Sequence, residues 1–238
     1  MKAIFVAGTD TGVGKTVVTG CLARFFSQKG LRVITQKWVQ TGAKKDISED
    51  IDFHLKMMGK DRDDIRDYKN TVMPYVFNLS ASPHLASRLE RKNISSKKIK
   101  KSFGALSSCF DAVIVEGAGG VLVPIDSRHF LIDIAKDLKL PVLLVAENRL
   151  GAINQALLSI EALRARGMDV LGVIFNDLKK YDARILKDNP RIIKKLSGVR
   201  VFGTLPRGKS GEEIYRSFVP IAQKIQMRLK GTGPFSLI

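Results

Sequence analysis

The sequence predicts an α/β fold in a single domain, with a doubly wound, mostly parallel sheet that carries helices on both faces. Three observations lead to this fold class. Short runs rich in Val, Ile and Leu recur along the chain, helix-like stretches separate most of them, and polar or glycine-rich segments follow them. Continuous apolar runs are typical of parallel strands that are buried on both faces, and alternating strands and helices favour a parallel sheet.

The apolar runs and the stretches between them define the expected elements in order. The strands are expected at 3–7, 32–36, 112–115, 141–146, 170–175 and 200–204. The helices are expected at 15–29, 50–58, 84–91, 96–106, 131–138, 152–166, 182–196 and 212–229. Segment 61–83 is the least regular, and we expect it to pack over the site. No internal repeat, low-complexity linker or domain boundary interrupts the chain, so one domain over 1–238 is expected.

Composition and charge narrow the class of protein. A hydrophobic fraction of 45% and a charged fraction of 26% are those of a globular protein, and no apolar stretch approaches the length of a membrane span. The net charge is +17, but the basic residues are spread along helical stretches without interleaved aromatics, so we interpret them as solvated helix faces. Cys21 and Cys109 lack the spacing of a metal site and are interpreted as small buried side chains in a cytoplasmic protein.

The loop between the first strand and the first helix carries the strongest functional signal. Residues 8–16 read Gly-Thr-Asp-Thr-Gly-Val-Gly-Lys-Thr. Glycines let backbone N–H groups converge on phosphate oxygens, and the start of the helix adds positive potential. Lys15 can reach the outer phosphates of a nucleotide, and the Thr16 hydroxyl can bind Mg²⁺. Although this loop is one residue longer than the strict phosphate-loop pattern, it predicts a protein that uses ATP or GTP.

Charged residues near the ends of other strands suggest phosphoryl chemistry, because ligands bind at the carboxyl edge of such sheets. Glu116 ends the third strand before a run of glycines and is a candidate ligand of Mg²⁺. Asp52 is a further candidate ligand, although three acidic residues crowd that helix start and favour its dipole in any case. Lys37 ends the second strand, where it either stabilises a negatively charged transition state or simply closes the strand as a surface lysine.

Other polar positions leave alternatives open. Gly151 begins a helix whose free N–H groups either bind a carboxylate or mark an ordinary helix start. Residues 176–177, Asn-Asp, either contact the edge of a nucleobase or form an Asx turn. His54, His84 and His129 are scattered, and we interpret each as a surface or packing residue rather than a catalyst.

Taken together and in order, these blocks resemble the dethiobiotin synthetase family of the P-loop NTPase superfamily, ATP-dependent enzymes that close the ureido ring in biotin synthesis. The resemblance covers nearly the whole chain. Its blocks are 8–16, 36–42, 73–77, 81–84, 115–120, 150–154, 176–177 and 203–206. Trp38 departs from the family pattern, which usually has proline there, and we expect its bulk to alter how that segment sits.

The resemblance implies a reaction of ATP, CO₂ and 7,8-diaminononanoate that passes through a carbamate and a carbamic–phosphoric anhydride. Lys37 and Lys15 would be the catalytic cations, and Thr16, Asp52 and Glu116 would hold Mg²⁺. The implied ATP contacts are Gly12, Val13, Gly14, Lys15, Thr16, Val17, Asp52, Glu116, Gly117, Ala118, Gly119, Asn176, Asp177, Pro206, Arg207, Gly208 and Glu213. The implied substrate contacts are Thr11, Lys37, Thr41, Gly151 and Ala152, in a homodimer with the site at the subunit interface.

Two other functions stay open at this stage. A partitioning or regulatory ATPase of the same fold would bind nucleic acid or membrane through its positive charge. Such proteins often carry an extra lysine at the start of the loop, where this chain has Thr9, Asp10 and Thr11. A cobalamin-pathway amidoligase would need a glutaminase cysteine, and neither Cys21 nor Cys109 has that setting. We therefore expect small-molecule substrates, with no membrane partner and no nucleic-acid partner.

Overall fold

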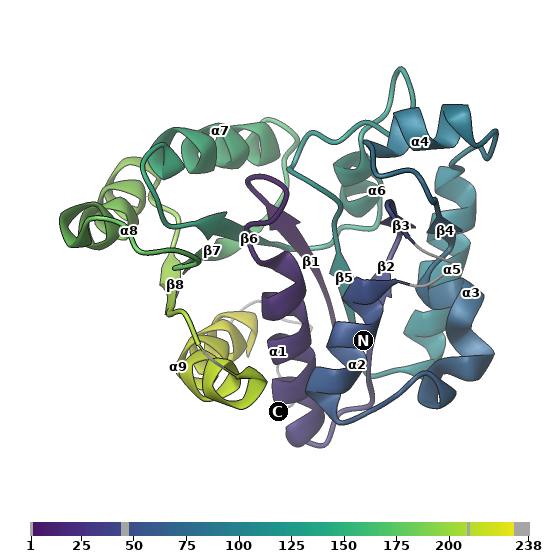
Figure 1. Cartoon of the computed structure of the whole chain (residues 1–238), viewed down its shortest axis with the longest axis horizontal. Helices are drawn as coiled ribbons and strands as arrows, with labels where there is room; N and C mark the ends of the chain where they lie inside the picture. The colour runs from purple at the N-terminus through teal and green to yellow at the C-terminus, as the bar shows by residue number, and fades with distance from the viewer. Residues whose placement is uncertain (1, 44–47, 209, 231–238) are drawn as a thin grey trace.

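A six-stranded parallel sheet lies at the centre of the computed structural model, which describes residues 2–43, 48–208 and 210–230 (Figure 1). The strand order is β2-β5-β1-β6-β7-β8, and each neighbouring pair is parallel. The strands are β1 (Lys2–Gly8), β2 (Val33–Lys37), β5 (Ala112–Glu116), β6 (Val142–Glu147), β7 (Val170–Asn176) and β8 (Val201–Leu205). This confirms the predicted fold class, and every predicted strand is present.

Helices cover both faces of the sheet, as the alternation of elements predicts (Figure 1). The helices that match predicted ones are α1 (Lys15–Gln28), α2 (Glu49–Met58), α4 (Pro83–Leu89), α5 (Ser96–Cys109), α6 (Leu131–Asp137), α7 (Ala152–Arg164), α8 (Ala183–Ser197) and α9 (Gly211–Lys230). In the described ranges, none of the helices combines the length and the apolar character needed to cross a membrane.

Two apolar cores result from the two-residue period of the strands. In β1, Ile4 and Val6 point toward α1 and α9, whereas Ala3, Phe5 and Ala7 point toward the helices of the opposite face. Both sets are almost fully buried, which explains why the strands read as continuous apolar runs. Because all six strands are parallel, their carboxyl ends lie at the same edge of the sheet, and the two cores fix the position of that edge.

The irregular segment contains more structure than its sequence predicts. It forms a 3₁₀ helix at Asp63–Tyr68, a short helix α3 (Lys69–Val72) and strand β4 (Tyr75–Val76), which pairs in parallel with β3 (Val39–Gln40). Its last part lies alongside the residues that follow β3, because the N–H groups of Gly42 and Ala43 donate to carbonyls of residues 77–79. An earlier part contacts β2, because Gln36 Nε2 donates to the Thr71 carbonyl at 2.9 Å.

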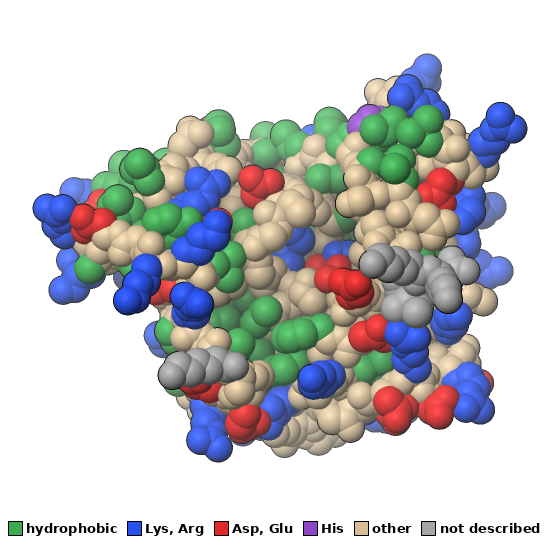
Figure 2. All heavy atoms as spheres, in the orientation of Figure 1, with side chains coloured by type: hydrophobic (Ala, Val, Ile, Leu, Met, Phe, Trp, Pro, Cys, Tyr) green, Lys and Arg blue, Asp and Glu red, His purple; other side chains and the backbone are tan. Residues whose placement is uncertain are grey.

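The distribution of surface charge can be compared with the expectation that the basic residues lie on solvated helix faces. Figure 2 shows Lys and Arg side chains dispersed around the rim of the viewed face, with Asp and Glu among them.

Cys21 is buried, and burial raises the pKa of its thiol to about 12. Cys109 is exposed at the end of α5, so its interpretation as a buried side chain was wrong. The helix period explains this, because Leu106 already fills the inward position of that last turn.

Candidate functional site

The glycine loop joins β1 to α1 at the carboxyl edge of the sheet. Gly14 precedes α1 with φ of 95°, and Gly12 has φ of 76°, both in the left-handed region that favours glycine. A Cβ atom on Gly14 would lie 1.9 Å from the Asn176 side-chain nitrogen, whereas one on Gly12 would meet nothing within 4 Å. The loop conformation therefore depends on glycine at both positions, and at Gly14 the space requires it as well.

Lys15 is buried at the start of α1, and its ammonium group folds back on the loop. Nζ donates to the carbonyl oxygens of Asp10 at 2.9 Å and Gly119 at 2.8 Å. Burial and the nearby charge of Lys37 lower the pKa of Lys15 to about 8, and neighbouring carboxylates offset only part of that effect. The protonated form of Lys15 is therefore partly destabilised where it lies beside the loop. An anion bound next to it would stabilise that form.

An ion-pair cluster occupies the ends of β2 and β5, beside Thr16. Lys37 and Glu116 lie opposite each other in the strand register, and Lys37 Nζ is 2.6 Å from Glu116 Oε1 and 2.8 Å from Asp50 Oδ2. Thr16 Oγ1 lies 2.8 Å from Asp50 Oδ1 and 3.1 Å from Glu116 Oε1. The hydroxyl, the amine and the two carboxylates thus converge on one point at the sheet edge.

The electrostatics of this cluster favour its charged form. Burial alone would raise the pKa of Glu116, but Lys37 and His54 outweigh burial and lower it to about 2. Burial would likewise lower the pKa of Lys37, yet the carboxylates of Glu116 and Asp50 raise it above its usual range. Lys37 is therefore a buried, charged group in the cluster, and the alternative of a surface lysine closing the strand does not hold.

The structure places Asp50, rather than Asp52, in this cluster. Asp52 points to the surface, where Arg62 Nε lies 2.7 Å from its Oδ1. Residues two apart on a helix point about 200° apart, so Asp50 and Asp52 face nearly opposite sides of α2. The prediction that Asp52 lies with Thr16 and Glu116 was therefore wrong, and Asp50 takes that position.

His54 lies beside the cluster, although the sequence did not single it out as a candidate site residue. It lies one turn after Asp50 on α2 and is fully buried, with Nε2 2.8 Å from Glu116 Oε2. Its burial agrees with the interpretation of a packing residue, and the helix period also places it next to Asp50. Ile51 and Leu55 turn toward the core, and Asp50 and His54 each come one residue earlier, so both lie on the same side of the helix.

The predicted glycine segment after β5 borders the same cluster. Lys37 Nζ donates to the Gly117 carbonyl at 3.1 Å, and Gly119 supplies the carbonyl that Lys15 contacts. Ala118 is half-buried between them. A Cβ on Gly119 would come within 3.5 Å of the Thr11 hydroxyl oxygen, which brings the exposed Thr11 to the edge of this segment.

Residues 176–177 lie beside the loop but are already engaged with the protein. Asn176 is buried and donates from Nδ2 to the Val13 carbonyl at 3.2 Å. Asp177 accepts from the Asn148 side-chain amide at 2.9 Å, and burial raises the pKa of Asp177. Val17 follows Thr16 on α1 and packs against the core on the α1 side of the sheet. The structure therefore brings Asn176 to the phosphate loop.

The remaining predicted residues lie further out. Gly151 precedes α7 with φ of 87°, the helix begins at Ala152, and Gln155 Nε2 reaches the Asp10 carboxylate at 3.4 Å. Thr41 is half-buried after β3. The segment at 206–208 follows β8, at the opposite edge of the sheet from β2, and Pro206, Arg207 and Glu213 are exposed while Gly208 is half-buried.

Trp38 turns away from the cluster and into the core. Its side chain is fully buried, its ring centre lies 5.2 Å from that of Phe5, and its indole N–H donates to Gln36 Oε1 at 2.8 Å. Lys37 and Trp38 point in opposite directions, as successive residues of extended chain do. The Trp38 side chain therefore packs in the apolar core, on the side away from Lys37.

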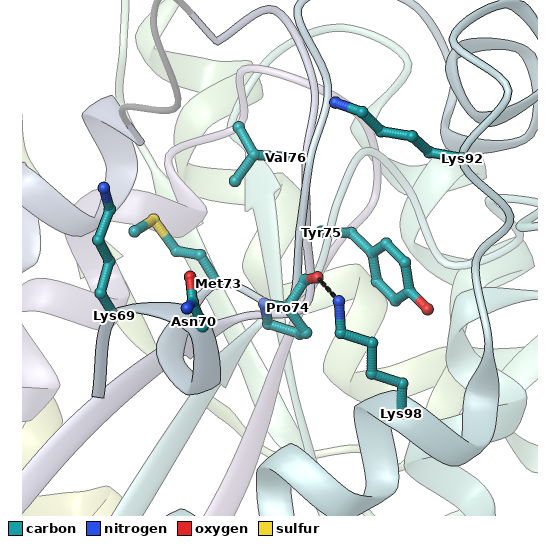
Figure 3. A pocket seen from close by; sticks show the side chains of 8 residues that line it. All are labelled: Lys69, Asn70, Met73, Pro74, Tyr75, Val76, Lys92 and Lys98. Atoms are coloured by element: carbon teal, nitrogen blue, oxygen red, sulfur yellow. Dashed lines mark hydrogen bonds between the residues drawn. The ribbon is translucent and has the colours of Figure 1, made fainter. Parts of the chain in front are cut away.

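A separate hollow of about 340 Å³ lies by the irregular segment (Figure 3). Lys69, Lys92 and Lys98 line it together with Tyr75, and Lys98 Nζ donates to the Pro74 carbonyl at 2.8 Å. Lys98 also lies over the Tyr75 ring, 4.5 Å from its centre. None of the predicted site residues lines this hollow. Figure 2 shows another hollow near the centre of the viewed face, beside the start of α1 as Figure 1 places it.

The chain is similar in sequence to a known family of proteins. A family model described as an AAA domain matches residues 2–213. The ATP-dependent dethiobiotin synthetase BioD 2 of Haemophilus influenzae is 42% identical over 186 residues, covering 78% of this chain and 96% of that relative. BioD of Chlorobaculum tepidum is 40% identical, covering 86% and 85%, and BioD of Thermodesulfovibrio yellowstonii is 36% identical, covering 92% and 97%.

Solved structures share the fold at much lower identity. The pNOB8 ParA structure bound to nonspecific DNA aligns with a TM-score of 0.63 and 15% identity, covering 98% of this chain and 99% of that chain. The MinC:MinD cell division complex of Aquifex aeolicus aligns with a TM-score of 0.60 and 17% identity, covering 98% and 97%. At these identities the likeness concerns the fold alone.

Proposed function

The chain belongs to the family of ATP-dependent dethiobiotin synthetases, and from that premise we propose that it is the ring-forming ligase that makes dethiobiotin from 7,8-diaminononanoate, CO₂ and ATP. The observation that carries the proposal is the convergence of Lys37, Glu116, Asp50 and Thr16 beside a glycine loop that holds Lys15. A charged, water-poor cluster of this kind suits the activation of an anionic substrate by a triphosphate.

The chemistry divides into three steps. One amino group of the diamine adds to CO₂ and loses a proton, which gives a carbamate. A carbamate oxygen then bonds to the γ-phosphorus of ATP while the bond to ADP breaks, which gives a carbamic–phosphoric anhydride. The second amino group attacks the carbonyl carbon, the carbon–oxygen bond to phosphate breaks, and the amine proton leaves as the five-membered ring closes.

The two lysines act by position and charge. Lys15 holds the outer phosphates once its Nζ leaves the carbonyls of Asp10 and Gly119. Lys37 stands at the end of β2, where it neutralises charge on the carbamate and on the transferring phosphoryl group. No general base is required for the phosphoryl step, because the attacking carbamate is already an anion.

The oxygen atoms of Thr16, Asp50 and Glu116 fit a magnesium ion. The described residues contain no group of three His, Cys, Asp or Glu arranged to hold a metal alone. Mg²⁺ at a phosphate site, however, takes one or two carboxylates together with substrate phosphates, which is the donor set present here. Held by Thr16, Asp50 and Glu116, Mg²⁺ would supply positive charge to these carboxylates and to the phosphate oxygens, and Lys37 would then face the substrate.

We assign the remaining contacts from the family resemblance. Thr11 and Thr41 border the carbamate end of the diamine, and Asn176, Asp177, the segment at 206–208 and Glu213 lie toward the nucleoside. We assign Gly151 and Ala152, at the start of α7, to a substrate carboxylate from a neighbouring subunit. To bind it, the Ala152 N–H must leave the Arg149 carbonyl, to which it donates at 3.1 Å. This arrangement requires a homodimer with the site at its interface, in the cytoplasm where ATP is supplied.

Product formation tests the function directly. Purified protein is incubated with ATP, Mg²⁺, bicarbonate and the diamine, and dethiobiotin is measured by mass spectrometry alongside phosphate release. We expect both products in equal amounts and only when the diamine is present. Phosphate release at the same rate without the diamine would contradict the proposal, and a further incubation with DNA would then ask whether the ATPase serves nucleic-acid binding.

A further inference from the structure

His54 contacts the ion-pair cluster through the Glu116 oxygen that Lys37 does not contact. The ring is fully buried, and Nε2 lies 2.8 Å from Glu116 Oε2. Neither ring nitrogen makes a well-aligned hydrogen bond within the part of the chain that the structure describes, so the contact to Glu116 is short but poorly directed. Because a carboxylate oxygen only accepts, Nε2 must carry the proton for this contact to be attractive.

The two oxygens of Glu116 therefore have different neighbours. Oε1 faces Lys37 Nζ at 2.6 Å and Thr16 Oγ1 at 3.1 Å, whereas among the described residues Oε2 has its one polar contact with His54. The terminal torsion of a glutamate is broad and nearly two-fold, so a carboxylate without such an anchor rotates easily. The close contact of His54 Nε2 with Oε2, at 2.8 Å, restricts this rotation.

We propose that His54 is a positioning residue for Glu116, which holds Oε2 so that Oε1 stays turned toward Thr16 and Asp50. This rests on the proposed function, since it gives the carboxylate the orientation that a metal held by Thr16, Asp50 and Glu116 needs. His54 does not contact substrate in this role. It acts as the outer partner of a ligating side chain, a kind of contact whose loss weakens metal binding.

The alternative is that His54 only fills space in the core. A leucine or phenylalanine would serve that purpose better, because a buried imidazole without well-made hydrogen bonds is costly. The helix geometry also argues for a role toward the cluster. Asp50 and His54 are one turn apart, so a single face of α2 supplies one carboxylate to Lys37 and one imidazole to Glu116.

The test compares His54→Leu and His54→Gln with a matched control, Thr19→Val. Thr19 is also fully buried with a side-chain oxygen that lacks a partner in the described residues, but it is not part of the cluster. Mn²⁺ serves as the probe, and its binding to the ATP complex is measured by electron paramagnetic resonance, together with the Mg²⁺ dependence of turnover and the thermal unfolding of each variant.

We expect His54→Leu to weaken Mn²⁺ binding by about ten- to a hundred-fold, the effect typical of losing an outer partner of a metal ligand. His54→Gln recovers part of the loss, because its amide nitrogen occupies nearly the place of Nε2 and can donate. Thr19→Val leaves Mn²⁺ binding unchanged. ATP affinity measured in the presence of a chelator is the same in all of these variants and the wild type.

Unchanged Mn²⁺ binding in His54→Leu, or an equal loss in Thr19→Val, would overturn the proposal. Should the leucine variant fail to fold, His54→Asn takes its place, because its shorter side chain cannot reach Oε2. The asparagine variant must then bind Mn²⁺ more weakly than the glutamine variant. A wild type that makes no dethiobiotin yet shows these Mn²⁺ differences would refute the proposed function and leave the role of His54 intact.

Discussion

Lys37 Nζ lies 2.6 Å from Glu116 Oε1 across two adjacent parallel strands, and both side chains are almost fully buried. Asp50 completes the pairing from α2, at 2.8 Å from the same amine. The ammonium group of Lys37 therefore compensates the charge of both carboxylates. Under the proposed function, Mg²⁺ would face the same carboxylate oxygens that now face Lys37.

Replacing Lys37 by methionine should separate catalysis from nucleotide binding. We expect turnover to fall by about 10²–10³-fold, the effect of removing one group that stabilises transition-state charge. ATP binding is retained, because Lys15 and the loop are intact. Product formation and calorimetric titration of ATP measure the two effects. Turnover close to that of the wild type would remove Lys37 from the mechanism.

The same substitution should destabilise the protein when no metal is present. Removing one partner of a buried ion pair leaves Glu116 uncompensated, which costs about 3–5 kcal/mol in the free energy of unfolding. Mg²⁺ should restore part of that loss, since it binds the same oxygens. Urea unfolding with and without Mg²⁺ is the measurement, and equal stability of wild type and variant without metal would show that Lys37 does not compensate Glu116.

Asp50→Asn and Asp52→Asn form a matched pair on one helix. We expect Asp50→Asn to raise the Mg²⁺ concentration for half-maximal turnover by about tenfold or more, since even the loss of an outer partner costs that much. Asp52→Asn should leave the Mg²⁺ curve unchanged, because that carboxylate pairs with Arg62 at the surface. A reversed order of the two effects would restore Asp52 to the site.

Gly12→Ala and Gly14→Ala test the loop in the same paired way. Both place a side chain at positive φ, which costs about 1–2 kcal/mol. Gly14→Ala also drives a methyl group into the Asn176 amide, whereas Gly12→Ala meets open space. We therefore expect the larger loss of ATP affinity and of stability from Gly14→Ala. Calorimetry and thermal unfolding measure these effects, and equal losses would mean that Asn176 moves aside.

Acid stability should depend on Glu116. Its folded-state pKa is lowered to about 2, from 4.5 in the unfolded chain, so the unfolded state binds more protons between these values. The stability that Glu116 contributes is therefore fully present above about 4.5 and is lost as the pH falls toward 2. Denaturant unfolding of wild type and Glu116→Gln from pH 7 to pH 3 checks this. The stability difference between them should change only below pH 5.

ATP affinity should depend on the charge of Lys15. With a pKa of about 8, the amine loses its proton as the pH rises through 8, while triphosphate binding favours the charged form. We expect the dissociation constant for ATP to rise by about tenfold per pH unit above 8, as linkage of one proton requires. Calorimetry from pH 7 to pH 9.5 gives the slope, and Lys15→Arg, which stays charged, should flatten it.

The sequence predicts the sheet and most helices because their signals are local. Strands buried on both faces need continuous apolar runs, and the glycine loop needs its glycines wherever it occurs. The small β3–β4 sheet was missed because each of its strands contributes only two residues, too few for a periodic pattern. Its pairing arises from chain segments that meet only in the folded protein.

The site was predicted less completely than the fold. Lys37 and Glu116 stand out because each ends an apolar strand, and strand ends are fixed in space by the sheet. The choice between Asp50 and Asp52 depends instead on the rotation of α2 about its axis. Ile51 and Leu55 fix that rotation by packing into the core. The Ser48 hydroxyl also fixes it, because it accepts a hydrogen bond from the Ile51 N–H and donates one to Gln40 Oε1. Three-dimensional packing decides it.

Trp38 gives the chain an internal optical reporter. It is the single tryptophan of the sequence, it is shielded from water, and it is covalently adjacent to Lys37 at the end of β2. Its indole therefore senses small shifts of the strand that carries the lysine. Fluorescence of the unlabelled protein can follow the arrival of nucleotide, metal and diamine one by one, and stopped-flow mixing would give their order in real time.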